Sequence, residues 1–308
     1  MISYFARRLL LLIPVFFGLS VVIFMIIHLV PGDPIDHILQ IGSSPERKAE
    51  LMAKYGFDRP LLVQYGIWLG KLMQGDLGDA IILKQPVAAL IAQNLPYSLA
   101  LGSAALVFST LVGIAIGALA AMAKDSLFDR ALMGIILAGS TVPSFWLGLM
   151  MILIFAVELG WFPVSGAKNW QAMVLPVLTI GLGGIALVAR VTRVAMLDAA
   201  RQDFVMMLHA KGVSRRDIYL RHILRHAMLP VVTLLGLKIG WILGGAVTIE
   251  FVFARPGLGS LLITSLNQRD YPVVQGCLLM LGIAVMLGTL LADVVQAAID
   301  PRIRDRVT

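Results

Sequence analysis

The chain of 308 residues is 59% hydrophobic and 14% charged, with a mean hydropathy of +0.89. Soluble domains carry about 25% charged residues, so this composition excludes a soluble protein and indicates an integral membrane protein. The formal net charge of +7 comes from cations in separate loops between apolar runs. That distribution is typical of cytoplasmic loops and not of a nucleic-acid-binding face.

The N-terminal part predicts one span followed by a polar insertion. Residues 9–30 form an apolar run after Arg7 and Arg8 that is too long for a signal-peptide core, so residues 1–30 should hold an inside N-terminus and a first span. A Pro-Gly-Asp-Pro turn at 31–34 then stops the helix. Residues 31–96 are the most polar part, with helix-like runs at 45–54 and 62–72. We expect a small helical, periplasmic insertion on the outer surface.

Five further apolar runs complete the predicted membrane domain, residues 97–298. They cover residues 97–123, 131–157, 173–196, 230–253 and 273–298. The first is rich in Gly and Ala, which lets helices approach closely. Pro143 should bend the second. The third ends at the inner surface with Arg190 and Arg193. Residues 254–272 are partly apolar and are expected to fold back against the bundle.

The distribution of cations predicts the orientation of these six spans. The cations expected inside are Arg7, Arg8, Lys124, Arg130, Arg201, Lys211, Arg215, Arg216, Arg221, Arg225, Arg302, Arg304 and Arg306. The two short outer loops hold only Lys168, Arg255 and Arg269. Because short cytoplasmic loops collect Lys and Arg, both termini should be cytoplasmic, with residues 299–308 as a tail. The predicted fold is an all-α integral membrane protein with six transmembrane helices.

A basic island at 203–228 interrupts the membrane domain. Its pattern is helix, break, helix: Gly212 breaks the first helix, and Ser214 can cap the second, which carries Leu220, Leu224 and Ala227 on one stripe. So many cations cannot lie in hydrocarbon, which places the island in a cytoplasmic loop. An amphipathic loop at that position needs a partner to cover its apolar stripe.

The island also carries a family resemblance. Ala210-Lys211-Gly212, then Arg221-His222, Ala227, Leu229 and Pro230, resemble the cytoplasmic loop of permease subunits of binding-protein-dependent ABC importers, closest to the dipeptide/oligopeptide/nickel branch. The 31–34 turn, Gly75-Asp76-Leu77-Gly78, the segment 250–259, Arg269-Asp270-Tyr271-Pro272 and residues 298–302 extend this resemblance over the whole chain. One departure stands out. Met206-Met207-Leu208 occupy the place of the family's Glu-Ala-Ala.

The resemblance implies a transport subunit that is not itself an enzyme. Its implied partners are a second, homologous permease subunit in a heterodimer, two ATP-binding subunits, an extracytoplasmic substrate-binding protein and the lipid bilayer of the inner membrane. The coupling loop would dock on the ATPase. The residues implied for that contact are Phe204, Val205, Leu208, Ala210, Lys211, Gly212, Arg216 and Arg221. Di- or oligopeptides are the expected cargo, with nickel, glutathione or another small solute as alternatives.

The sequence carries no support for an enzyme, a cofactor or a metal centre. It has no Gly-x4-Gly-Lys-Ser/Thr loop for ATP and no His-Glu-x-x-His motif. His222 and His226 have metal-ligand spacing but lie among arginines, which favours solvation or contact with the ATPase. A secondary transporter is the alternative class, and it would require internal repeats and ion-coupling charges at mid-membrane.

Three ionisable residues fall inside the predicted spans and are candidates for the pathway or its gate: Lys238, Glu250 and Asp293. Glu250 and Asp293 lie near span ends and suit structural roles. Lys238 lies about two turns into the fifth predicted span. We expect it either to snorkel to the inner surface or to pair with Asp293.

Overall fold

The computed structural model describes residues 2–29, 46, 58–239 and 243–299, and within them side chains 8–26, 46, 58–239 and 243–294. In chain order its helices are α1 Ile2–Leu29, α3 Leu61–Met73, α4 Val87–Met122, α5 Leu127–Ser140, α6 Ser144–Met151, the π-helix η1 Ile152–Glu158, α7 Gln171–Ala199, α8 Asp203–Ala210, α9 Arg215–Asp217, the π-helix η2 Ile218–Ile223, α10 Leu224–Ile239, the 3₁₀ turn η3 Gly244–Ala246, α11 Val247–Val252, α12 Leu258–Gln268 and α13 Tyr271–Ile299. The described part of the chain is all-α.

Five helical stretches are long and apolar enough to cross a membrane: Arg8–Ile26, Val87–Met122, Gln171–Ala199, Arg215–Ile239 and Tyr271–Val294. A sixth crossing is complete only if α5 is joined to α6 and η1, and these two parts meet at a bend of 98°. Pro143 ends α5 as the sequence predicts, because a proline disfavours helical geometry in the residue before it. The two helical parts therefore lie nearly at a right angle and do not form one kinked helix.

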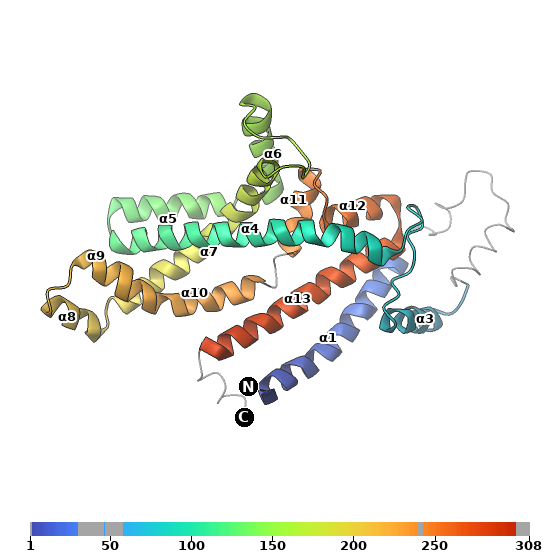
Figure 1. The fold of residues 1–308 in the computed structure, drawn as a ribbon, viewed down its shortest axis with the longest axis horizontal. Helices are drawn as coiled ribbons and strands as arrows, with labels where there is room; N and C mark the ends of the chain where they lie inside the picture. The colour runs from blue at the N-terminus through green and yellow to red at the C-terminus, as the bar shows by residue number, and fades with distance from the viewer. Residues whose placement is uncertain (1, 30–45, 47–57, 240–242, 300–308) are drawn as a thin grey trace.

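The centre of the bundle is the pair α4 and α7, which run side by side over most of their length (Figure 1). Glycines of α4 allow this closeness, as the Gly- and Ala-rich run predicts. A Cβ on Gly117 would lie 2.5 Å from the Ala189 carbonyl oxygen, and one on Gly113 would lie 2.6 Å from the Val188 Cβ. α10 and α13 flank this pair, and α1 packs on α13. Small residues therefore set the spacing of the core.

The end of the bundle near α12 is closed by a hydrophobic cluster from three helices. Val87, Leu90 and Ile91 of α4 pack there against Leu258 of α12, and the buried thiol of Cys277 in α13 lies in the same cluster. The turn at 79–82 is tied down beside it, because Asp270 accepts hydrogen bonds from the Ile81 and Ile82 amides at 3.0 and 2.8 Å. The Arg-Asp-Tyr-Pro segment at 269–272 thus holds the turn at 79–82 in place through Asp270.

The described part of the insertion packs on the first span. Tyr65 of α3 contacts Phe24 edge-on at 5.4 Å between ring centroids, and its hydroxyl lies 2.9 Å from Ser20 Oγ. Trp68 completes the aromatic contact, as the apolar stripe of 62–72 predicts, whereas Leu62 points away and is 84% exposed. The helix expected at 45–54 lies outside the described residues, apart from position 46.

The helices differ from the predicted apolar runs in two places. α4 begins at Val87, ten residues before the expected start at 97, and carries Pro96 inside the helix. The expected fifth span 230–253 is not one helix. Its first part belongs to α10, which continues the basic island without interruption from Arg215, and its last part is the short η3 and α11. Glycines at 244 and 245 lie in the 3₁₀ turn, where their low helix propensity favours a break.

Candidate functional site

The basic island forms a compact helical hairpin at the opposite end of the bundle from α12 (Figure 1). Its first helix, α8, ends in a Schellman motif. The Gly212 amide donates to the His209 carbonyl at 2.9 Å, and the Val213 amide donates to the Leu208 carbonyl at 3.1 Å. Gly212 has φ +74°, the left-handed conformation that this motif requires. The helix break predicted at Gly212 is confirmed.

The second part of the hairpin also begins as predicted. Ser214 Oγ accepts a hydrogen bond from the Asp217 amide at 3.2 Å and caps α9. The chain then passes through the π-helix η2 directly into α10. The predicted stripe is confirmed in part: Ala227 is buried and Leu224 packs half-buried in the same cluster. Leu220, however, is 40% exposed, and Ile218 and Ile223 are the fully buried residues. The wider π-helical turn shifts which residues face inward, and a 3.6-residue pattern misplaces them.

The apolar side of the hairpin is already covered by the chain's own spans. Val205, Ile218, Ile223 and Ala227 pack on Ala118 and Ala121 of α4 and on Met196 and Ala199 of α7. Phe204 stacks near His226 at 4.6 Å between ring centroids, and Leu208 is half-buried in the same cluster. Phe204, Val205 and Leu208 therefore anchor the hairpin to the bundle and do not form its outer surface.

A different set of residues faces outward. Met206 and Met207 are 75% and 52% exposed, and Ala210, Lys211 and Gly212 continue the same exposed edge. Two adjacent exposed methionines form a flexible apolar surface of the kind found at protein interfaces. Arg216 and Arg221 are exposed beside it; Arg221 approaches Asp217 at 3.5 Å. The hairpin presents a small apolar face with a basic rim.

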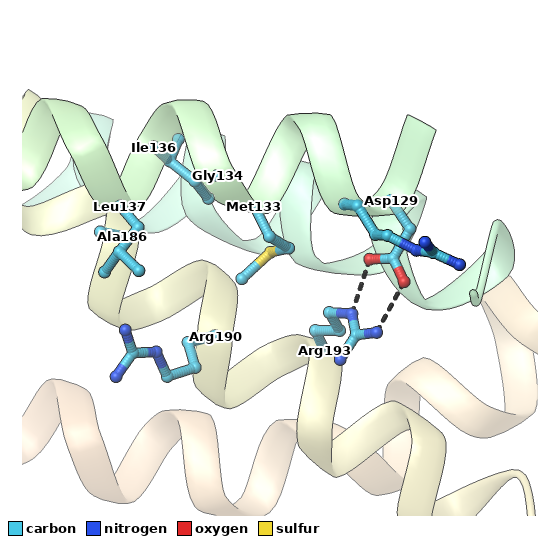
Figure 2. A pocket seen from close by; sticks show the side chains of 9 residues that line it. Asp129, Met133, Gly134, Ile136, Leu137, Ala186, Arg190 and Arg193 are labelled. Carbon is cyan, nitrogen blue, oxygen red and sulfur yellow. Dashed lines mark hydrogen bonds and ion pairs between the residues drawn. The ribbon is translucent and has the colours of Figure 1, made fainter. Parts of the chain in front are cut away.

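An ion pair that was not predicted from the sequence joins α5 to α7. Asp129, 2% exposed, accepts from Arg193 Nε at 2.7 Å and from Arg193 Nη2 at 2.6 Å (Figure 2). The Asp129 carboxylate also accepts from the Asp125 amide, and Ser126 caps α5. The Ser-x-x-Asp spacing before an apolar run was the available signal. A bidentate pair of this geometry fixes the inner end of α5 to α7.

The three ionisable candidates occupy separate places. The expected pair of Lys238 and Asp293 is wrong: Lys238 Nζ donates to the Gly184 carbonyl at 3.2 Å, and Asp293 pairs with Arg8 of α1 at 3.0 Å. The small residues Gly184 and Ser109 leave room for the lysine side chain between α7, α4 and α10. Asp293 thus joins the first and last spans and has a structural contact.

Glu250 is fully buried and organises the start of α12. Its Oε2 accepts from the Gly259 amide at 2.8 Å and from the Ser260 amide at 3.3 Å. The two preceding amides are satisfied by α4: Gly257 donates to Asn94 Oδ1 and Leu258 donates to Ser98 Oγ. Four consecutive amides at a helix start normally lack backbone partners. The segment 250–259 therefore caps the start of α12.

Comparison with known proteins covers the whole chain. The family described as "Binding-protein-dependent transport system inner membrane component" matches residues 113–305, and its N-terminal companion family, "Binding-prot-dependent transport system membrane comp, N-term", matches residues 1–102. "Glutathione transport system permease protein GsiC" of Escherichia coli O6:H1 is 41% identical over 308 residues, covering 99% of each chain. The proteins of the same name from Escherichia coli K12 and Shigella boydii are each 40% identical with the same coverage.

Solved structures share the fold at lower identity. A chain of the MetNI methionine ABC transporter in an inward-facing conformation aligns with a TM-score of 0.59 at 19% identity, covering 68% of this chain and 96% of that one. A chain from an amino acid ABC transporter with histidines aligns with a TM-score of 0.53 at 18% identity, covering 68% and 94%. These likenesses support the helical architecture of the described spans.

Proposed function

Because the chain belongs to the family of binding-protein-dependent transport system inner membrane components, we propose that it forms part of the translocation pathway for di- or oligopeptides or a peptide-like solute such as glutathione. It is a multi-pass inner-membrane permease subunit of an ABC importer and is not itself an enzyme. Separate ATPase subunits drive such an importer, and a substrate-binding protein feeds it. The observation that carries the substrate class is the end-to-end identity with permeases named for glutathione transport.

The exposed face of α8 supports a docking role for the hairpin. Met206 and Met207, where the family's Glu-Ala-Ala would stand, offer the apolar contact, while the Schellman turn at Gly212 holds them at the tip. Phe204, Val205 and Leu208 transmit movement by their packing on α4 and α7. Lys211, Arg216 and Arg221 form the rim, where exposed ion pairs contribute about 0–1 kcal/mol each and mainly affect association rate.

The second permease subunit is proposed to be a homologue and not another copy of this chain. The resemblance to the peptide branch supports a heterodimer, in which each subunit would present its own hairpin to one ATPase. Purification of the importer from cells that express the neighbouring transport genes, followed by mass measurement of the intact complex, would distinguish one copy of this chain from two.

We propose that both termini and the hairpin are cytoplasmic and that residues 31–96 are periplasmic, from the distribution of cations. Cysteines introduced at Ser126 and Arg216 should react with a membrane-impermeant thiol reagent only from the cytoplasmic side, and a cysteine at Lys168 only from outside. All three positions lie in exposed or half-exposed segments. Labelling of the Arg216→Cys variant from outside in intact cells would contradict this orientation.

The substrate is tested on the importer assembled with its own binding protein. We expect glutathione or short peptides, added with that binding protein, to raise ATP hydrolysis several-fold in reconstituted vesicles and to accumulate inside. Nickel added alone and free amino acids serve as controls for the alternative cargoes. Stimulation by nickel but not by any peptide would reject the proposed substrate class while leaving the importer assignment intact.

A further inference from the structure

Lys238 places a cation deep in the membrane domain. Its Nζ donates to the Gly184 carbonyl of α7 at 3.2 Å, and Gly184 lies about 20 and 22 Å from the two ends of α7, at Gln171 and Ala199. The hydrocarbon core of a bilayer is about 30 Å thick. α10 ends beside the middle of α4 (Figure 1), which agrees with this depth. The ammonium group therefore lies near mid-membrane.

No acidic side chain among the described residues neutralises this ammonium group. Lys238 forms no ion pair within that part of the chain. Asp293 is held by Arg8 at 3.0 Å, and Glu250 accepts two amides at the start of α12. An ammonium group offers three donors, and the Gly184 carbonyl takes one of them. Two donors and a positive charge are thus available for a ligand.

Small and polar groups adjoin the Lys238 ammonium group. A Cβ added to Gly184 would lie 2.8 Å from Lys238 Nζ and 3.0 Å from Ser109 Oγ, so both groups lie beside one point between α7, α4 and α10. Ser109 is 2% exposed, and its hydroxyl donates to the Leu106 carbonyl at 3.1 Å. Lys238 is only half-buried, and the neighbouring Gly183 is exposed. A solute can therefore approach the ammonium group.

The charge of Lys238 needs a reason beyond packing. A charged side chain at this depth is costly, and such residues mark substrate and ion pathways in membrane proteins. A hydrogen bond between α7 and α10 needs only a neutral donor. A cation without a counter-ion favours an anion, and charge-assisted hydrogen bonds to a carboxylate are strong. Peptides end in a carboxylate, and glutathione carries a carboxylate at each end.

We propose that Lys238 binds a carboxylate of the transported solute part-way through the membrane and thereby favours solutes that carry this group. The inference rests on the proposed function, which supplies a peptide-like solute, and it adds the chemical group that the pathway recognises. An acidic residue of the second permease subunit would offer the same charge from another source. A purely structural lysine would join α7 to α10 and would be indifferent to the charge of the solute.

The test measures uptake by the complete importer in vesicles, with its own binding protein saturated by each solute. The solutes are glutathione, a tripeptide, and the same molecules with their carboxylates converted to amides. The amide keeps the size and polarity of the solute and removes the negative charge. We expect Lys238→Met to lower uptake of the carboxylate forms about tenfold and to affect the amides much less.

Two further variants separate charge from hydrogen bonding. Lys238→Arg keeps the cation and should retain most of the uptake of the carboxylate forms. Lys238→Gln keeps a neutral donor and should lose as much as Lys238→Met. Leu237→Met is the matched control, because Leu237 precedes Lys238 in α10, is 52% exposed and carries no charge. It should leave uptake of every solute unchanged.

The outcomes distinguish the possible roles of the cation. Selective loss of carboxylate uptake, retained by arginine and not by glutamine, supports the proposal. Equal loss for carboxylates and amides in Lys238→Met, or full uptake in Lys238→Gln, would assign a structural role and overturn it. Loss of the second permease subunit from purified Lys238→Met would show that this subunit supplies the counter-ion, which also overturns it. Absence of uptake of all these solutes by the unaltered importer would instead reject the proposed substrate class, and this inference with it.

Discussion

Replacing Glu250 with alanine is expected to release the start of α12 from α11 and to cause a large loss of stability. The change removes the acceptor of the Gly259 and Ser260 amides in a fully buried place and leaves both without a partner. Each buried, unpaired amide costs about 1–3 kcal/mol, so the loss of both partners should lower the free energy of unfolding by about 2–6 kcal/mol. Thermal unfolding in detergent, followed by the fraction of monodisperse protein, measures the effect.

Two further variants make this result specific. Glu250→Gln keeps an oxygen acceptor and should lose only part of the stability. Glu158→Ala removes an exposed carboxylate at the end of η1 and should change nothing measurable. An unfolding temperature of Glu250→Ala equal to that of Glu158→Ala would show that the carboxylate does not hold α12. The same capping predicts that Gly259→Val fails to fold, because its Cβ would lie 2.2 Å from the Val247 Cα.

Replacing Gly212 with valine is expected to uncouple transport from ATP hydrolysis without preventing insertion. At φ +74° a β-branched residue is strained by about 1–2 kcal/mol, enough to open the Schellman turn but not the hydrophobic cluster beneath it. The Met206 and Met207 face should then lose its fixed orientation. Solute uptake in reconstituted vesicles should fall at least about tenfold, while binding-protein docking persists and ATP hydrolysis no longer follows substrate.

The chain offers a matched control for this strain. Gly160 has φ +62° and, like Gly212, has no atom within 4 Å of an added Cβ. Gly160→Val should therefore be strained to a similar degree in a loop that the proposed orientation places on the outer side, with coupling preserved. Crosslinking from Ala210→Cys to the ATPase locates the contact directly. Full coupling in Gly212→Val, together with no crosslink from positions 205–218, would reject the hairpin as the coupling element.

The long spans and the turn chemistry were predictable from local sequence. Apolar length predicts α1, α7 and α13 to within a few residues at most ends, and Gly212 and Ser214 mark the hairpin turns because backbone conformation and capping depend on one residue type each. Pro143 likewise locates the break before α6. These features need no knowledge of which helices are neighbours.

Features that depend on distant neighbours were not predictable. The apolar run at 230–253 continues through the glycines at 244 and 245, so hydropathy alone does not separate α10 from α11. Lys238 and Asp293 have compatible charges, but the packing of α1 on α13 places Arg8, and not Lys238, next to Asp293. Phe204 and Val205 lie on a stripe that could face either a partner or the chain's own spans, and only the position of α4 and α7 decides between them.

The rate at which the buried Cys277 thiol is chemically modified can report on the opening of the core. It is 0% exposed in the cluster that joins α4, α12 and α13, so a maleimide reaches it only when these helices separate. The rate of its modification in the unaltered chain therefore measures how often that end of the bundle opens, in the way that hydrogen exchange measures local opening. If the modification rate increases during turnover, its comparison with the rate of ATP hydrolysis would show how often this end of the bundle opens for each hydrolysed ATP. The measurement needs no engineered residue.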